Sequence, residues 1–356
     1  MSAEMRQINV KGEKERLFWI DYARGLGLVL VVLAHSQLPF KIFEIISYII
    51  VVFPFISGYL YREMNLNEFF KKRIPLIYSY YHIGFIGLVL WLFLVPLELK
   101  KADNLSYVIN YIFVRTVDMD SVPLTIVPLW YLFFLFLAEF VYQVSNKLNI
   151  LYYVIALGIA KRFMGFQIHS FKIGVAFSGL YMFHLGRVFK EKNVRINNIV
   201  GIISFFGWII IGWFFGETGW NFDCYGKNAI GKFFVIIGEI LCAIFFYWFA
   251  KILEKAVNQK GFLHVVSVYI TKFLKEFSDN AIFVFGYHIT VGGLIFALLR
   301  VFGLNVSIET VSKYWYITFL FMIASVYLLI KCLPKPVKLF LSQPDAFLKS
   351  IRKNKA

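Results

Sequence analysis

The amino-acid sequence predicts an all-α, polytopic integral membrane protein with about ten transmembrane helices. Hydrophobic residues make up 60% of the 356 positions and charged residues only 16%, whereas an ordinary soluble domain is about a quarter charged. The mean hydropathy is +0.69. Apolar stretches of about 20 residues, the length that crosses the hydrocarbon core of a bilayer, recur along the whole chain. These observations exclude a soluble fold.

The apolar stretches follow one another in the order 17–38, 43–61, 75–97, 126–146, 148–164, 172–189, 196–215, 230–253, 280–302 and 313–333. The fifth is the least regular, because Lys161 and Arg162 interrupt it. The longest connections, 98–125 and 254–279, are too short for a separate soluble domain. The sequence therefore predicts one membrane domain, 17–333, between an N-terminal segment, 1–16, and a basic tail, 334–356.

The distribution of Lys and Arg supports this number of spans, because these residues accumulate in cytoplasmic loops. With the N-terminus inside, 25 of the 37 Lys and Arg residues fall in inner segments, and both termini are cytoplasmic. Topology and contacts with lipid headgroups then explain the net charge of +16 better than nucleic-acid binding does, since no basic soluble face is present. In the tail, Lys and Arg alternate with Leu and Phe, which predicts a helix at the inner membrane surface.

The sequence contains no motif that predicts a metal site. Its cysteines, Cys224, Cys242 and Cys332, have neither metal-ligand spacing nor the pattern of a disulfide framework. Segment 226–233 imitates a phosphate-binding loop, but Phe233 stands where a Ser or Thr would bind magnesium. We therefore expect no metal cofactor.

The first span carries Asp21, Arg24 and His35 on one face. Arg24 and His35 are eleven residues apart, about three helical turns, and Asp21 lies one turn before Arg24. An Arg or Asp at the centre of a membrane helix costs about 2.5 to 3.5 kcal/mol on translocon scales, so such residues usually serve a function. The structural alternative is that Asp21 and Arg24, at i and i+3, neutralise each other.

The stretch Trp19-Ile-Asp21-Tyr-Ala-Arg24-Gly-Leu, followed by Val-Val-Leu-Ala-His35, resembles the first-helix signature of the acyltransferase type-three family, which comprises bacterial integral-membrane O-acyltransferases. Further resemblances are Phe53-Pro-Phe-Ile-Ser57-Gly58-Tyr59, Leu129-Trp130-Tyr131-Leu, Phe183-His-Leu-Gly186, and Ser278-Asp-Asn280 through Tyr287-His288. The match covers nearly the whole chain. Its compact size looks most like the fucose-4-O-acetylase-like and polysaccharide O-acetyltransferase branch.

This resemblance implies a multi-pass protein of the bacterial cytoplasmic membrane. It implies transfer of an acyl group, as a rule acetyl, from cytoplasmic acetyl-CoA or another acyl-CoA to a hydroxyl of a cell-envelope or exported glycan, or of a lipid-linked sugar. Two motifs depart from the family pattern. Ser278-Asp279-Asn280-Ala281 replaces a Gly-x-Asn-Ser or Gly-x-Asn-Thr turn, and Lys71-Lys72-Arg73 replaces an Arg-x-x-Arg pair.

Acyl transfer to a hydroxyl requires a base that removes the hydroxyl proton during attack. Neutral imidazole, with an ordinary pKa of about 6.5, suits this task, and we expect His35 to be the general base. His35 lies roughly 16 Å outward of Arg24, at 1.5 Å per residue, so a cytoplasmic donor and an external acceptor can meet there. We expect the donor phosphates to bind Arg62, Lys72 and Arg73, and the pantetheine arm to pass Arg24. The basic cluster at 71–73 serves topology equally well.

Three further residues are candidates for substrate binding: Trp130, Glu139 and His288. His288 lies deep in the ninth span and needs a polar partner, and Glu139 suits pairing with a histidine or an arginine. Trp130 has an indole that can stack on a sugar ring. For each residue the alternative is structural, namely packing or a buried polar network.

The rival function is a transporter or flippase for a lipid-linked glycan. Intramembrane charges and basic inner loops suit that function as well. Transporters, however, commonly contain inverted repeats, and two similar halves are not visible in this sequence.

Overall fold

The computed structural model describes residues 16–94, 109–114, 127–164, 170–216, 229–301 and 312–353. In these residues all regular structure is helical, which confirms the predicted all-α class. In chain order the elements are α1 Phe18–Ala34, α2 Phe40–Ser47, η1 Tyr48–Val51, α3 Val52–Leu60, α4 Leu66–Leu94, η4 Val127–Leu129, α6 Trp130–Lys147, α7 Leu151–Met164, η5 Ser170–Lys172, α8 Ile173–Glu191, α9 Asn198–Phe215, α10 Ala229–Val257, α11 Phe262–Asp279, α12 Ala281–Val301, α14 Trp315–Cys332, α15 Lys335–Ser342 and α16 Pro344–Lys353. Cys224 and the first three residues of the imitated phosphate-binding loop, 226–228, lie outside the described residues, and the rest of that loop forms the start of α10.

A helix occupies each of the ten predicted apolar stretches. Five helical segments of the described chain are both long and apolar enough to cross a membrane: Phe40–Leu60, Leu66–Leu90, Asn198–Phe215, Ala229–Val257 and Trp315–Cys332. The described part of α12, Ala281–Gly293, is apolar but shorter. The chain is therefore a multi-pass membrane protein, while the count of ten spans and the cytoplasmic termini stay predictions.

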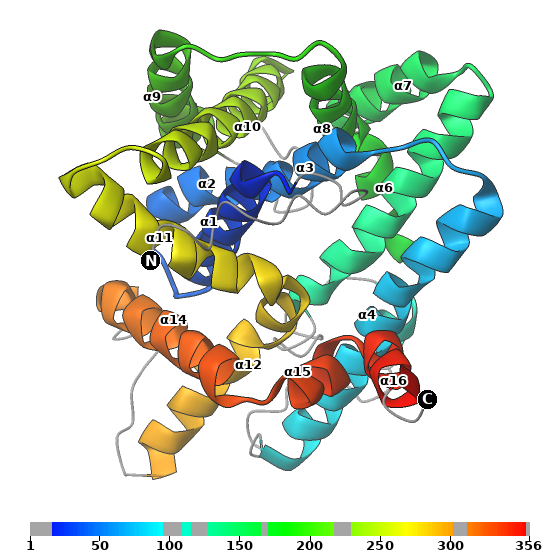
Figure 1. Ribbon diagram of the computed structural model, residues 1–356. Coiled ribbons are helices and arrows are strands. Elements are labelled where there is room, and N and C mark those ends of the chain that lie inside the picture. Colours follow the sequence, from blue (N-terminus) through cyan, green and yellow to red (C-terminus); the bar gives the residue numbers. More distant parts are fainter. Residues whose placement is uncertain are drawn as a thin grey trace.

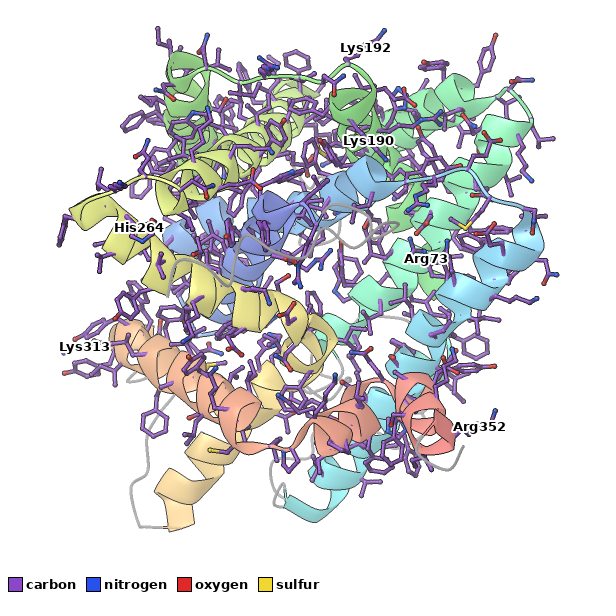
Figure 2. The ribbon with its side chains drawn as sticks, viewed as in Figure 1. Arg73, Lys190, Lys192, His264, Lys313 and Arg352 are labelled. Carbon is purple, nitrogen blue, oxygen red and sulfur yellow. The ribbon has the colours of Figure 1, made fainter. Side chains whose placement is uncertain are left out.

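Helix α1 lies at the centre of the bundle, and α2, α3, α10, α11, α12 and α14 contact it (Figure 1). Trp19, Leu28 and Val32 of α1 are fully buried in the hydrophobic core. The long basic side chains Lys192, Lys313 and Arg352 lie at the periphery (Figure 2), whereas the half-buried Arg73 of α4 reaches Glu139 of α6. Of the residues that the sequence analysis singled out in the first span, Asp21 is buried, and Arg24 and His35 are partly buried.

Helices α3 and α8 pack closely through two glycines. A β-carbon at Gly58 would overlap the carbonyl oxygen of Phe183, and one at Gly186 would overlap the carbonyl oxygen of Phe55. Small residues allow this close approach of helix backbones in membrane proteins. Two of the motifs quoted from the sequence, 53–59 and 183–186, therefore meet in space and fix α3 beside α8.

The connection predicted at 254–279 contains an 18-residue helix, α11, which the hydropathy windows did not reveal. Its lysines, including Lys272 and Lys275, lower the mean hydropathy of the segment, but its apolar face with Leu274 and Phe277 is buried. This face packs against α1 so closely that a β-carbon at Gly25 would overlap the backbone of Leu274. Helix α11 is therefore part of the bundle and not a loop.

Two other boundaries differ from those expected. Helix α4 begins at Leu66, nine residues before the apolar stretch, because the Asn65 side chain accepts a hydrogen bond from the Glu68 backbone N–H at 2.8 Å and caps its first turn. The tail forms two short helices, α15 and α16, and folds onto α4 and α12. There Tyr287 donates to the carbonyl oxygen of Leu341 at 2.9 Å.

Candidate active site

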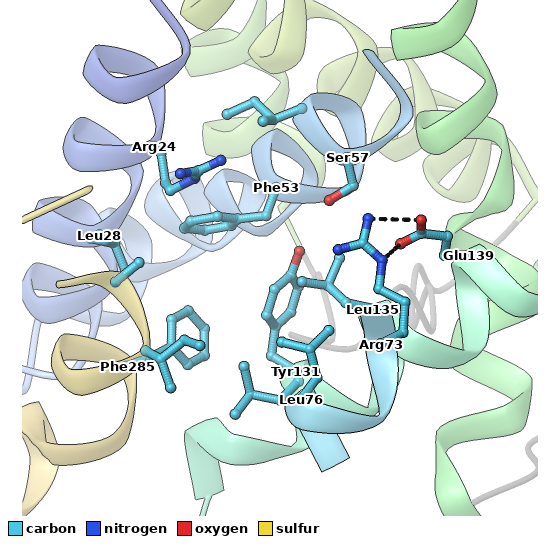
Figure 3. A pocket seen from close by; sticks show the side chains of 14 residues that line it. Arg24, Leu28, Phe53, Ser57, Arg73, Leu76, Tyr131, Leu135, Glu139 and Phe285 are labelled. Carbon is cyan, nitrogen blue, oxygen red and sulfur yellow. Dashed lines mark hydrogen bonds and ion pairs between the residues drawn. The ribbon is translucent and has the colours of Figure 1, made fainter. Parts of the chain in front are cut away.

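Arg24 of α1 lines a cavity of about 160 Å³ between α1, α3, α4, α6 and α12 (Figure 3). Its guanidinium extends into the cavity, and within the described residues it makes neither a hydrogen bond nor an ion pair. The walls are mostly apolar, with Leu28, Leu76 and Leu135 among them. A charged group without a protein partner beside a cavity is available to a ligand.

Arg73 of α4 lies at the other side of this cavity and is paired. Its Nε lies 2.7 Å from Oε2 of Glu139, and its Nη2 donates to Oε1 of Glu139 at 2.8 Å (Figure 3). Glu139 of α6 is buried, with 3% of its surface exposed. The expected arginine partner of Glu139 is therefore Arg73, and this two-point contact fixes the orientation of the guanidinium.

A second cavity, of about 250 Å³, lies next to the first one. Leu60, Arg62, Met64, Lys72 and Arg73 line it, and Arg73 lines both cavities. The structure thus brings together the three basic residues that the sequence analysis proposed for the donor phosphates. Lys72 also pairs with Glu68 at 3.2 Å on the exposed side of α4.

His35 directly follows α1 and contacts His288 of α12, with 3.3 Å between His288 Nε2 and His35 Nδ1. Nδ1 of His288 lies 2.9 Å from the carbonyl oxygen of Val284, and Nδ1 of His35 lies 2.8 Å from that of Val31. Because a carbonyl oxygen only accepts, both Nδ1 atoms carry the proton in the neutral rings. His35 then donates through Nδ1 and keeps its lone pair on Nε2.

An aromatic triangle of Phe53, Tyr131 and Phe285 lies between the Arg24 cavity and this histidine pair. The ring centroids are 5.3 Å apart for Phe53 and Tyr131, 5.2 Å for Tyr131 and Phe285, and 5.9 Å for Phe53 and Phe285. All three residues line the cavity, and Phe285 is one helical turn before His288. Along the chain, the cavity residues of α1 are followed by His35, and those of α12 are followed by His288. The histidine pair therefore lies next to the cavity.

Asp21 and Trp130 do not line either cavity. Asp21 pairs with Arg16 at 2.7 Å and accepts a hydrogen bond from Ser278 Oγ at 3.1 Å, so its direct ion pair is with Arg16 and not with Arg24. Trp130 packs on Phe134, and the ammonium of Lys172 lies 5.4 Å from its ring centroid. The contacts of Trp130 favour packing over sugar binding.

The model of the acyltransferase type-three family, described as an acyltransferase domain, matches residues 17–330. The chain belongs to this acyltransferase family. The match includes α1, both cavities and the histidine pair. Comparison with curated proteins and with solved structures gave no significant match.

In this membrane acyltransferase, Ser278 takes a role that the altered turn motif did not suggest. Its hydroxyl ties the junction of α11 and α12 to Asp21 at the start of α1, and Arg16 bridges Asp21 and Asp279 with contacts of 2.7 Å to each. Since Arg24 and His35 follow on α1 and His288 follows on α12, this network sets the register between the two helices that carry them. Asp21 is therefore a positioning residue by its contacts.

The sequence analysis did not assign Tyr131, which is 2% exposed and whose hydroxyl has no hydrogen-bond partner in the described part of the chain. Tyr131 appears there only as part of the motif Leu129-Trp130-Tyr131-Leu. The signal that reveals it is spatial, namely a buried hydroxyl that points into the Arg24 cavity (Figure 3).

Among the described residues, no group of three or more His, Cys, Asp or Glu side chains is arranged to hold a metal ion.

Proposed function

We propose that this acyltransferase moves an acyl group, as a rule acetyl, from cytoplasmic acyl-CoA to a hydroxyl of an envelope or exported glycan, with His35 as the general base. The observation that carries the proposal is the order of the groups. The basic cavity comes first, the smaller cavity lined by Arg24 comes next, and the histidine pair comes last. Arg73 lines both cavities. An acyl-CoA has phosphates, a pantetheine arm and a thioester in the same order.

The basic cavity supplies the donor phosphates with Arg62 and Lys72. Arg73 contributes less net charge there, because Glu139 neutralises it, and acts at the passage between the two cavities. The pantetheine arm then passes Arg24 and the aromatic triangle, and the thioester reaches His35. Donor and acceptor would meet part-way across the membrane.

The reaction requires one base at the meeting point. Nε2 of His35 takes the proton of the acceptor hydroxyl while that oxygen attacks the thioester carbon. The carbon–sulfur bond then breaks, and the departing thiolate takes the proton from His35 Nε2, which leaves an ester and free CoA thiol. The Nδ1–H of His35 faces two acceptors, the carbonyl oxygen of Val31 and Nε2 of His288, and together they hold the ring orientation and favour the tautomer with a basic Nε2.

The decisive experiment measures transfer of label from radiolabelled acetyl-CoA into cell-surface glycan in membranes that contain wild-type or His35→Ala protein at matched abundance. We expect label with wild type and a loss of about 10²-fold to 10⁴-fold with His35→Ala, the usual contribution of a general base. His264→Ala is the matched control, because His264, in the first turn of α11, contacts the carbonyl oxygen of Val257 at the end of α10 and lines neither cavity. Equal label in wild type and His35→Ala would contradict the mechanism, and no label in either would favour a different acyl donor or the transporter alternative.

A further inference from the structure

The hydroxyl of Tyr131 is held in place although no group of the described chain binds it. Phe53 and Phe285 contact the ring from two directions, and the residue is 2% exposed. The hydroxyl has no hydrogen-bond partner in the described residues and points into the Arg24 cavity (Figure 3). A buried hydroxyl usually finds a partner because leaving it unmet costs free energy. This one therefore indicates a partner that enters the cavity from outside.

Arg24 offers a second set of donors to the same space. A guanidinium has five N–H donors and no acceptor, and that of Arg24 has no partner in the described part of the chain. Both Tyr131 and Arg24 can thus bind acceptor oxygens. Among the described residues that line the cavity, the one carboxylate is Glu139, and Arg73 already engages it, so within this part of the chain it does not compete with a ligand oxygen.

The walls of the cavity decide which oxygens fit. Leu28, Ile56, Leu76, Leu132 and Leu135 surround the two donors, and an apolar wall disfavours a doubly charged phosphate without full pairing. A slim chain that alternates methylene groups with amides fits this cavity, because its amide oxygens accept from the two donors and its methylene groups contact the apolar walls. The pantetheine arm of CoA has this chemistry, and its place between phosphates and thioester matches the place of the cavity between Arg62 and His35.

We propose that Tyr131 and Arg24 donate hydrogen bonds to amide carbonyl oxygens of the pantetheine arm, and that Tyr131 is thereby a donor-positioning residue. The proposal deepens the proposed function and rests on it. Its specific content is that the Tyr131 hydroxyl contributes to binding of the arm and not to binding of the phosphates or to proton transfer.

The test compares purified full-length wild type with Tyr131→Phe, which keeps the ring and its contacts and removes only the hydroxyl. Binding of CoA is measured directly, and binding of adenosine 3′,5′-bisphosphate is measured in parallel, because this probe has nucleotide phosphates but no pantetheine arm. We expect Tyr131→Phe to weaken CoA binding about threefold to tenfold, the range for loss of one hydrogen bond, and to leave binding of the bisphosphate unchanged. In the transfer assay KM for acetyl-CoA rises by the same factor with kcat near the wild-type value.

Tyr80→Phe serves as the matched control. Tyr80 is also 2% exposed, but its hydroxyl donates to the carbonyl oxygen of Tyr111 at 2.8 Å and it lines neither cavity, so its variant should bind CoA as wild type does. Equal CoA binding by Tyr131→Phe and wild type would overturn the inference alone. Equal weakening of CoA and bisphosphate would overturn it in favour of a general packing effect. Absence of CoA binding by wild type would overturn the inference together with the proposed function.

Discussion

Two arginines inside this membrane protein illustrate opposite solutions to the same energetic problem. Arg162 of α7 is 2% exposed, and its Nη1 and Nη2 donate to the two carboxylate oxygens of Glu239 on α10 at 2.6 and 2.8 Å. Nη1 also donates to the hydroxyl of Tyr181 on α8 at 2.9 Å. Arg24 of α1 instead faces a cavity without a partner in the described residues.

The difference separates a structural charge from a functional one. The Arg162–Glu239 ion pair joins α7 to α10, and the contact with Tyr181 adds α8. Neither Arg162 nor Glu239 lines either cavity. The Arg24 guanidinium has donors to offer because the protein left them unpaired. A charged residue in a predicted span that lacks a protein partner therefore indicates a site, and the absence of a partner is not visible in hydropathy.

The largest effect that tests this comparison is on stability. Arg162→Met leaves Glu239 as an unpaired buried carboxylate, and breaking such a pair costs about 3 to 5 kcal/mol. We expect a marked fall in the thermal unfolding temperature of the protein in detergent. The double variant Arg162→Met with Glu239→Leu should recover most of it, because apolar replacement of a whole buried pair is often neutral. An unfolding temperature of Arg162→Met equal to that of wild type would show that the pair is not structural.

The second largest effect is on ligand binding. Arg24→Met should weaken CoA binding and leave stability intact, which is the opposite of the pattern expected for Arg162→Met. Arg24→Met removes a guanidinium that has no protein partner, so we expect an unfolding temperature equal to or above that of wild type. CoA binding should weaken by about 1.5 to 3 kcal/mol, the range for hydrogen bonds from a charged group. The measurements are thermal unfolding and CoA titration on the same preparation. A variant that unfolds early and binds CoA normally would reverse the assignment of the two arginines.

Two tyrosine variants test the same comparison, and their expected effects on stability and on binding are smaller. Tyr181 donates to Glu239 and accepts from Arg162, so Tyr181→Phe should lower stability by about 1 kcal/mol and leave CoA binding intact. Tyr131→Phe should do the reverse. Both substitutions remove one buried hydroxyl, and thermal unfolding together with CoA titration separates their roles. If both variants changed the same quantity, the division into a structural and a binding region would fail.

Particular residues show how far the sequence determines this picture. The long apolar stretches located most of the helices, and Asp21-x-x-Arg24 with His35 marked the first span as the one that carries candidate site residues, because those signals are local in the chain. The partners were not predictable, since Arg162 with Glu239 and His35 with His288 are brought together only by tertiary packing. Glu139 was expected to pair, but its choice of Arg73 depends on the position of α4 beside α6. Tyr131 escaped notice because a missing partner leaves no trace in a sequence.

Helix α11 was missed for a different reason. A hydropathy window averages its two faces, so Lys272 and Lys275 hide the apolar face that packs on α1. A helical-periodicity test over 262–279 would have revealed it. The consequence extends to the site, because Ser278 and Asp279 at the end of α11 bind Asp21 and Arg16 and hold α12 against α1.

The smallest predicted effect comes from the ion pair between Asp279 and Arg16. Both side chains are partly exposed to solvent, so this pair is a reference for the two interior arginines, Arg24 and Arg162. Partial burial raises the pKa of Asp279, but the hydrogen bonds from Lys275 and Arg16 outweigh this and hold its pKa below the ordinary value. A carboxylate with a lowered pKa adds stability above its unfolded-state pKa of about 4, and this stability is lost as the pH falls below that value. The Asp279 side chain is 42% exposed, so Asp279→Asn should cost less than about 1 kcal/mol at pH 7. Thermal unfolding of wild type and variant should converge as the pH is lowered through 4. A cost at pH 7 as large as that of Arg162→Met would mean that the network at the start of α1 belongs with the structural charges of the interior.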